Sequence, residues 1–190
     1  MLFGHAGLFR RRIIYDNAEL IIYQSRRDNQ MADKPERREL KFNSLDEVVA
    51  EVERLAASEV RTTGNHSFPE IVRHLALTHD MVTGKVQGPA PPWYMKLMIG
   101  LMKSQLLKEK PLSPGFNLPP AAEAFFWPTS EVSLQDAVAH LKASVANYKA
   151  NGPLPKHPIF GKVSAEKNLS MNCRHAAMHL SFAHPGEPAA

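Results

Sequence analysis

The sequence predicts an all-α fold in which four long helices and one accessory helix are joined by long, proline-rich connections. Three kinds of pattern support this. Apolar side chains recur every three or four residues in several runs, no segment alternates polar and apolar side chains as a half-buried strand does, and the fifteen prolines gather between the runs. Each such helix has one apolar stripe to bury, so a helical bundle is the architecture that this pattern favours.

The first two helices each begin at a capping box. Residues 44–47 read Ser-Leu-Asp-Glu, in which the serine accepts a hydrogen bond from an unpaired backbone amide and the glutamate accepts one in return. Apolar residues at helical spacing come next and predict a helix over residues 44–58. Residues 67–70 read Ser-Phe-Pro-Glu, with proline in the tolerated first turn, so a second helix is expected over residues 67–85.

The rest of the chain continues the alternation of helices and connections. We expect, in chain order, a helix over residues 93–108, an irregular connection over residues 111–128, a helix from Thr129 or Ser133 to Asn151, and a last helix that begins at Ser164 and ends before His184. The irregular connection holds five of the fifteen prolines. No strand and no internal repeat is predicted.

The first thirty residues differ in composition from the rest of the chain. They contain five arginines and three acidic residues, and they supply half of the net charge of +4. No charged segment precedes their short apolar stretches and no small-residue cleavage site comes after them, so they do not fit a secretory signal. We expect residues 1–31 to be an N-terminal extension, or translation to begin at Met31, and the helical domain to span residues 32–190.

Composition also excludes several classes of protein. Cys173 is the single cysteine, which excludes an internal disulfide and a cysteine-rich zinc module. No apolar run approaches the roughly 18 residues that a membrane-spanning helix needs. Basic residues are not concentrated in one region of the helical domain, as a nucleic-acid-binding domain would require. We therefore expect a cytoplasmic protein with neither a nucleic acid nor a membrane as partner.

Three of the nine histidines form a candidate metal site. His175 and His179 are four residues apart on the last predicted helix, so both rings project from one face about a turn apart. His74 lies on the second predicted helix, on or beside its apolar stripe. Metal sites in helical bundles are built from inward side chains on facing helices. Three imidazoles on two helices would leave a coordination position open, as catalytic sites do, whereas buried packing histidines are the alternative.

The other candidate residues have weaker signals. We expect His79 on the surface, His66 in a loop, His140 in a packing or surface position, His157 in a turn that could fold over a site, and Cys173 as a small buried hydrophobic residue. The Met-rich run Trp93–Leu107 is typical of core or of the wall of a pocket. A membrane-surface or partner-binding helix is the alternative for that run.

Three segments carry a resemblance to a known family. They read SFPEIVRHLA over residues 67–76, HPIFGKVS over residues 157–164 and RHAAMHLSF over residues 174–182. With them, the chain from about Arg38 to Phe182 resembles the DinB-like (YfiT-like) superfamily of four-helix-bundle metalloproteins, and within it the branch called domain of unknown function 1569. The resemblance implies a DinB-like four-helix bundle with an accessory helix.

The resemblance also implies a ligand set and a class of reaction. His74, His175 and His179 match the histidines that hold a divalent ion in that superfamily, whose characterised members include thiol-dependent transferases and isomerases. Residues 167–169 read Lys-Asn-Leu where related chains often carry a tryptophan, which leaves the shape of the pocket open. A low-molecular-weight thiol or another small molecule is the substrate that this implies.

Three neutral imidazoles leave a bound divalent ion with its full charge, which lowers the pKa of a water molecule or thiol bound to it. The expected function is therefore metal-dependent transfer or hydrolysis. Zinc, nickel, iron and manganese all accept imidazole ligands, so the sequence does not choose the metal. Glu70, four residues before His74, is a candidate to orient that ring, with His157 as a possible pocket residue and Asp80 a poorer choice.

Two other functions are consistent with the sequence. The first is a non-catalytic helical scaffold without metal, either a homodimer or a small-molecule-binding module, in which the Met-rich run makes the contact. The second is association with a membrane surface or a nucleic acid through residues 1–30, whose arginines would supply the charge.

Overall fold

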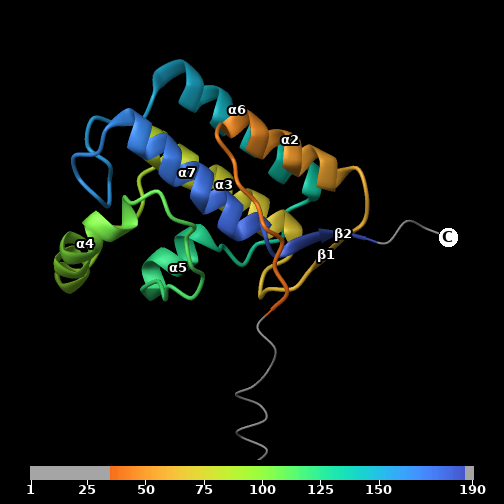
Figure 1. Ribbon diagram of the computed structural model, residues 1–190, viewed down its shortest axis with the longest axis horizontal. Helices are drawn as coiled ribbons and strands as arrows, with labels where there is room; N and C mark the ends of the chain where they lie inside the picture. Colours follow the sequence, from red (N-terminus) through yellow and green to blue (C-terminus); the bar gives the residue numbers. More distant parts are fainter. Residues whose placement is uncertain (1–34, 187–190) are drawn as a thin grey trace, which may run out of the picture. The chain divides into compact units, whose positions relative to one another are not determined.

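The computed structural model describes residues 35–186, which are mostly helical (Figure 1). In chain order the described elements are α2 (Leu45–Ala56), β1 (Val60–Thr62), α3 (Phe68–Thr83), α4 (Trp93–Leu106), α5 (Pro120–Phe126), α6 (Leu134–Asn151), α7 (Ala165–Leu180) and β2 (Ala183–Pro185). The described part therefore contains six helices and one two-stranded sheet. The extension predicted for residues 1–31 lies outside the described residues.

The helices begin where the capping residues predict. The side chains of Ser44, Ser133 and Ser164 each accept a hydrogen bond from the backbone amide three residues later. At the start of α3 the Ser67 amide donates to the Glu70 carboxylate, which completes the predicted capping box. These bonds satisfy amides that have no partner within the helix, which is why each helix starts at its serine.

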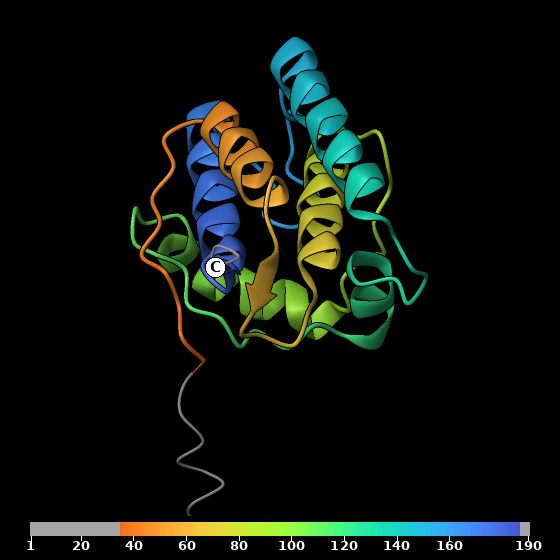
Figure 2. The same ribbon diagram turned by 90° about the vertical axis from the view of Figure 1, so that its right-hand side faces the viewer.

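The core lies among the four long helices α2, α3, α6 and α7. Helix α3 packs along α6, and α2 packs against both α6 and α7, while α3 also contacts α7 (Figure 2). The fully buried side chains with the largest volume are Leu55 of α2, Leu75 of α3, Leu141 of α6 and Leu180 of α7. Each long helix thus contributes the apolar stripe that its sequence predicts.

Two segments differ from the sequence-based expectation. β1 pairs antiparallel with β2, Arg61 opposite His184, although the sequence predicts no strand. Strands of three residues are too short for polar and apolar side chains to show a period. The connection expected to be irregular over residues 111–128 contains α5, which begins just after Pro119 and has Pro120 in its first turn. Proline is tolerated at that position because its missing amide hydrogen would have no helical partner.

The Met-rich run, expected in the core or in the wall of a pocket, forms α4 close to the predicted extent, and the first of these two positions is wrong. Among the described side chains of α4, Ile99 is the buried one. Its exposed large apolar side chains are Trp93, Tyr94, Leu97, Met98 and Leu101. The helix lies outside the group of four long helices (Figure 1), so only one side of it meets the protein. None of the described helices has the length and apolar content that crossing a membrane would require.

Candidate metal centre

Three histidines from two helices converge on one point. His74 comes from α3, and His175 and His179 come from successive turns of α7. The Nε2 atom of His175 lies 3.3 Å from Nε2 of His74 and 3.0 Å from Nε2 of His179. Each ring offers a ligand atom within 4.8 Å of the other two. The predicted convergence of these imidazoles is confirmed.

The packing of α3 on α7 explains why these side chains meet. The i, i+4 spacing places His175 and His179 on one face of α7, and that face is directed toward α3. His74 is buried, whereas His175 and His179 are half-buried. His175 and His179 therefore keep part of their exposure to solvent, whereas His74 on α3 keeps almost none.

A backbone carbonyl sets the orientation of His74. Its Nδ1 atom lies 3.3 Å from the carbonyl oxygen of Phe126, the last residue of α5. A carbonyl oxygen only accepts hydrogen bonds, so Nδ1 carries the hydrogen and donates it. The Nε2 atom of the neutral ring then has a lone pair directed at the other two histidines. Metal-binding histidines commonly have such a partner on the second ring nitrogen.

Trp127 forms an aromatic wall beside His74. The imidazole of His74 stacks on the indole with ring centroids 4.1 Å apart and planes inclined by 2°. The imidazole of His66, in the predicted loop, also stacks on the indole, at 3.5 Å and 7°. Two imidazoles cannot share one face of an indole at such separations without overlapping, so they lie on opposite faces. This sandwich holds the plane of the His74 ring.

Arg73 fastens the segment just after Trp127. The side chain is buried, and its Nη1 donates to the Ser130 carbonyl oxygen at 2.7 Å. Its Nη2 donates to the carbonyl oxygen of Pro128. We call residues 126–130 the strap, because they run from the carbonyl that orients His74 to the carbonyls that Arg73 holds. No motif or spacing in the sequence indicates a role at the site for Arg73, Phe126 or Trp127.

The electrostatic environment keeps the three rings neutral. Burial lowers the pKa of His74 well below its ordinary value, and the neighbouring His175 lowers it further. Burial and the charges of the other two rings lower the pKa of His179 in the same way. Burial lowers the pKa of His175 to about 4. Neutral imidazole is the form that binds a metal ion.

The donor set fits a single cation. Without an ion, the Nε2 atom of His74 acts as an acceptor. The short contacts of His175 with His74 and His179, at 3.3 and 3.0 Å, could then both be hydrogen bonds only if the two rings shared the single N–H hydrogen on Nε2 of His175. One cation would instead meet all three lone pairs. Imidazole nitrogens that each lie about 2.1 Å from one tetrahedral ion are roughly 3.4 Å apart, close to the observed separations. The residues present therefore suit a divalent ion of the kind that imidazole binds.

The other predicted site residues lie outside this group. The Glu70 carboxylate accepts hydrogen bonds from the amide and hydroxyl of Ser67, while the Phe126 carbonyl is the partner of His74. His157 is buried in its own turn, where its Nδ1 accepts from the amides of Ile159 and Phe160. Neither side chain belongs to the metal-compatible group found among the described residues.

The remaining candidates have structural surroundings. His79, expected on the surface, is only 1% exposed, so that expectation is wrong. Helix α3 is covered by α6 as well as α7, so a residue turned away from His74 is still buried. Asp80 accepts from His140 at 2.7 Å and pairs with Lys85 at 3.3 Å. Cys173 is buried, as predicted, and burial raises the pKa of its thiol to about 11.

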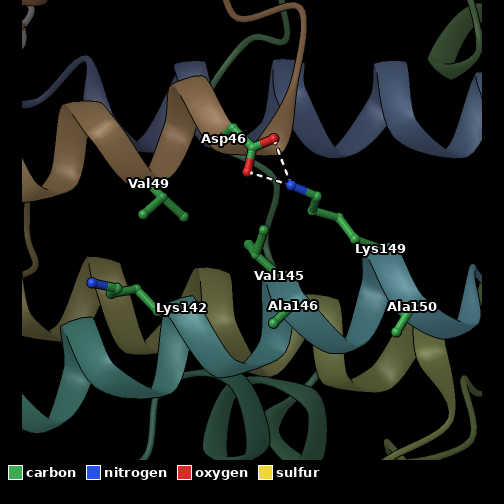
Figure 3. A pocket seen from close by; sticks show the side chains of 7 residues that line it. All are labelled: Asp46, Val49, Lys142, Val145, Ala146, Lys149 and Ala150. Carbon is green, nitrogen blue, oxygen red and sulfur yellow. Dashed lines mark hydrogen bonds and ion pairs between the residues drawn. The ribbon is translucent and has the colours of Figure 1, made fainter.

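A surface groove of about 520 Å³ lies between α2 and α6 (Figure 3). Val49 of α2 lines one side of it and Val145 with two alanines of α6 lines the other, and an ion pair of 2.8 Å between Asp46 and Lys149 crosses it. None of the three converging histidines lines this groove. It therefore does not form the approach to the metal centre.

Comparison with known proteins identifies one family. The model described as "Protein of unknown function (DUF1569)" matches residues 34–186. No curated protein and no solved structure matches the chain. The match covers all six described helices and both strands, including every residue of the candidate centre.

Proposed function

The chain belongs to the DUF1569 family, and from this premise we propose that His74, His175 and His179 hold a divalent metal ion that activates a water molecule or a thiol for transfer or hydrolysis. The observation that carries the proposal is the convergence of three Nε2 atoms on one point. We also propose that α2, α3, α6 and α7 form a DinB-like four-helix bundle. We further propose that the protein is cytoplasmic and that neither a nucleic acid nor a membrane is its partner.

The bound ion would supply one kind of chemistry: a lowered pKa of a water molecule or thiol at the site. The chain's own residues bind and orient. His74 is held by the Phe126 carbonyl and by Trp127, so its Nε2 lone pair has a defined direction before an ion arrives. His175 and His179 are half-buried, which leaves a path for a small molecule such as a low-molecular-weight thiol.

Metal analysis of the full chain, purified without a chelator or a histidine tag, tests the proposal. We expect about one zinc, nickel, iron or manganese ion per chain, and loss of that ion in the His175→Ala/His179→Ala variant without unfolding. His140→Ala is the matched control, because His140 is half-buried on α6 and lies outside the group. Absence of metal after each ion has been offered, or equal loading of the double variant, would contradict the proposal.

The exposed side of α4 favours a second function, a scaffold that forms a homodimer or holds a small molecule without metal. Leu97 and Leu101 are 61% and 72% exposed, and Trp93 is 78% exposed. An apolar helix face of this kind is commonly covered by a partner. Sedimentation over a hundredfold range of concentration discriminates the two: a metal-free protein whose mass rises with concentration supports the scaffold.

A further inference from the structure

The exposed side of α4 forms one continuous apolar face. Its exposed large apolar side chains are those of Trp93, Tyr94, Leu97, Met98 and Leu101, which we call the α4 face. With about 100° between successive residues, these five positions span an arc of about 140° on the helix. The buried Ile99 lies on the opposite side, so α4 packs on the protein through that side and presents the α4 face to solvent.

The charges of α4 lie away from this face. Lys96 and Lys103 are the charged residues of the helix, and its sequence contains no acidic residue. On a helical wheel they lie about 130° and 150° from the middle of the α4 face. Lys103 is directed toward the protein, where its Nζ donates to the Lys162 carbonyl oxygen at 2.8 Å. The surface that a partner would cover is therefore apolar and uncharged.

This distribution of charge favours a protein surface over a membrane as the occupant. A helix that lies in a membrane surface has a strongly charged face opposite its apolar one, and that charge attracts anionic lipids. In α4 the opposite side holds Ile99 and packs on the protein. An apolar, uncharged face calls for a partner of the same kind, and a second copy of this chain supplies one.

The α4 face is also large enough for a dimer. Trp93, Leu101 and Leu97 are 78%, 72% and 61% exposed, and Tyr94 and Met98 are each about half exposed. Together the five side chains expose about 650 Å² in each copy, so two faces packed together would bury about 1,300 Å². Specific protein interfaces bury roughly 1,200–2,000 Å². A second copy would therefore meet the requirement without any further surface.

We infer that a second copy of this chain covers the α4 face, with the two α4 helices antiparallel across a two-fold axis. Trp93, Leu97 and Leu101 are four residues apart, so they form one stripe with Leu97 at its centre. In the antiparallel arrangement Leu97 packs against its own counterpart, and Trp93 packs against Leu101 of the second copy. None of the three converging histidines lies on α4, so the dimer forms whether or not an ion is bound.

Sedimentation equilibrium of the full chain over a hundredfold range of concentration tests the inference. We expect wild type to reach twice the mass of one chain. Leu97→Glu should stay at the mass of one chain, because it would bury two like charges at the axis without partners. Phe116→Glu is the matched control, since Phe116 is 61% exposed and lies outside α4, and it should still dimerise. The His175→Ala/His179→Ala variant should dimerise as well.

A cysteine at the axis tests the arrangement of the two helices. The native Cys173 is buried, so Leu97→Cys adds an exposed thiol. Mild oxidation should join two copies of Leu97→Cys through a disulfide. The wild-type chain and Phe116→Cys, treated in the same way, should stay unjoined.

Several results would overturn the inference. Wild type with the mass of one chain at every concentration refutes the dimer, and a dimer that persists in Leu97→Glu places the interface elsewhere. Equal cross-linking of Leu97→Cys and Phe116→Cys refutes the two-fold arrangement. Wild type that stays at the mass of one chain and sediments with phosphatidylglycerol vesicles would assign the α4 face to a membrane. Both substituted side chains are exposed, so circular dichroism should show wild-type helical content and exclude unfolding as the cause.

Discussion

Arg73 is a buried cation whose side-chain partners are backbone carbonyls and a hydroxyl of the strap, residues 126–130. Replacing it by methionine keeps most of the apolar stem but removes the donors to Pro128 and Ser130. Hydrogen bonds from a charged donor contribute about 1.5–3 kcal/mol each. The variant no longer has to bury an unpaired charge, which offsets part of the loss. We expect the free energy of unfolding to fall by about 3 kcal/mol.

The same change should weaken metal binding, because the strap carries both groups that orient His74. Once the strap is released, the Phe126 carbonyl and the Trp127 ring lose their fixed positions. Loss of a hydrogen bond behind a metal-binding histidine typically costs 10–100-fold in affinity. Urea unfolding of the metal-free protein would measure the first effect. Competition with a chelator of known affinity would measure the second.

Arg54→Met is the control for loss of an arginine, because that side chain is 53% exposed and pairs with Glu51, three residues earlier on α2. It should change stability by less than about 1 kcal/mol and leave metal affinity unaltered. Unchanged metal affinity in Arg73→Met, with the expected loss of stability, would show that the strap supports the fold but does not position His74. Unchanged stability would refute the assignment of energy to the buried hydrogen bonds.

Two further predictions concern His79 and Gly84, both outside the metal centre. Burial lowers the pKa of His79 to about 3, so as pH falls from about 6.5 the unfolded chain takes up this proton before the folded one does. The free energy of unfolding should therefore fall toward acid pH by up to about 1.4 kcal/mol per pH unit. Urea unfolding between pH 7 and 5 should show that this free energy depends less steeply on pH in His79→Gln than in wild type. Gly84 has φ +80°, and a Cβ there would lie 3.0 Å from the Leu154 side chain. Gly84→Ala should lower stability by about 1–2 kcal/mol in thermal melts, whereas Gly100→Ala, with open space in α4, should not destabilise.

The helices and the three converging histidines could be predicted because their signals are local. A serine before an apolar run marks the start of a helix whatever surrounds it, as at Ser133 and Ser164. The spacing of His175 and His179 is likewise a property of α7 alone. Only the approach of His74 required a tertiary contact, and its place beside the apolar stripe of α3 indicated an inward direction.

The positioning groups could not be predicted because their signals are not local. The partner of His74 is a backbone carbonyl 52 residues away, and every residue has such a carbonyl. Helical periodicity also gave the wrong position for His79. A helical wheel gives the angle between two residues, but not how many faces of the helix are covered by neighbouring helices. The same limit applies to α4, whose apolar residues predict a buried helix although most of its described side chains are exposed.

The three metal ligands thus lie on core helices, whereas the groups that orient His74 lie in the strap. The three imidazoles lie on helices whose other faces form the core, so their convergence depends on the packing of α3 and α7. The group that sets the proton on His74 lies in a strap held by Arg73. Changes in the strap should therefore alter metal affinity while the helices stay packed, whereas loss of a core contact between the helices should weaken the fold and the metal centre together.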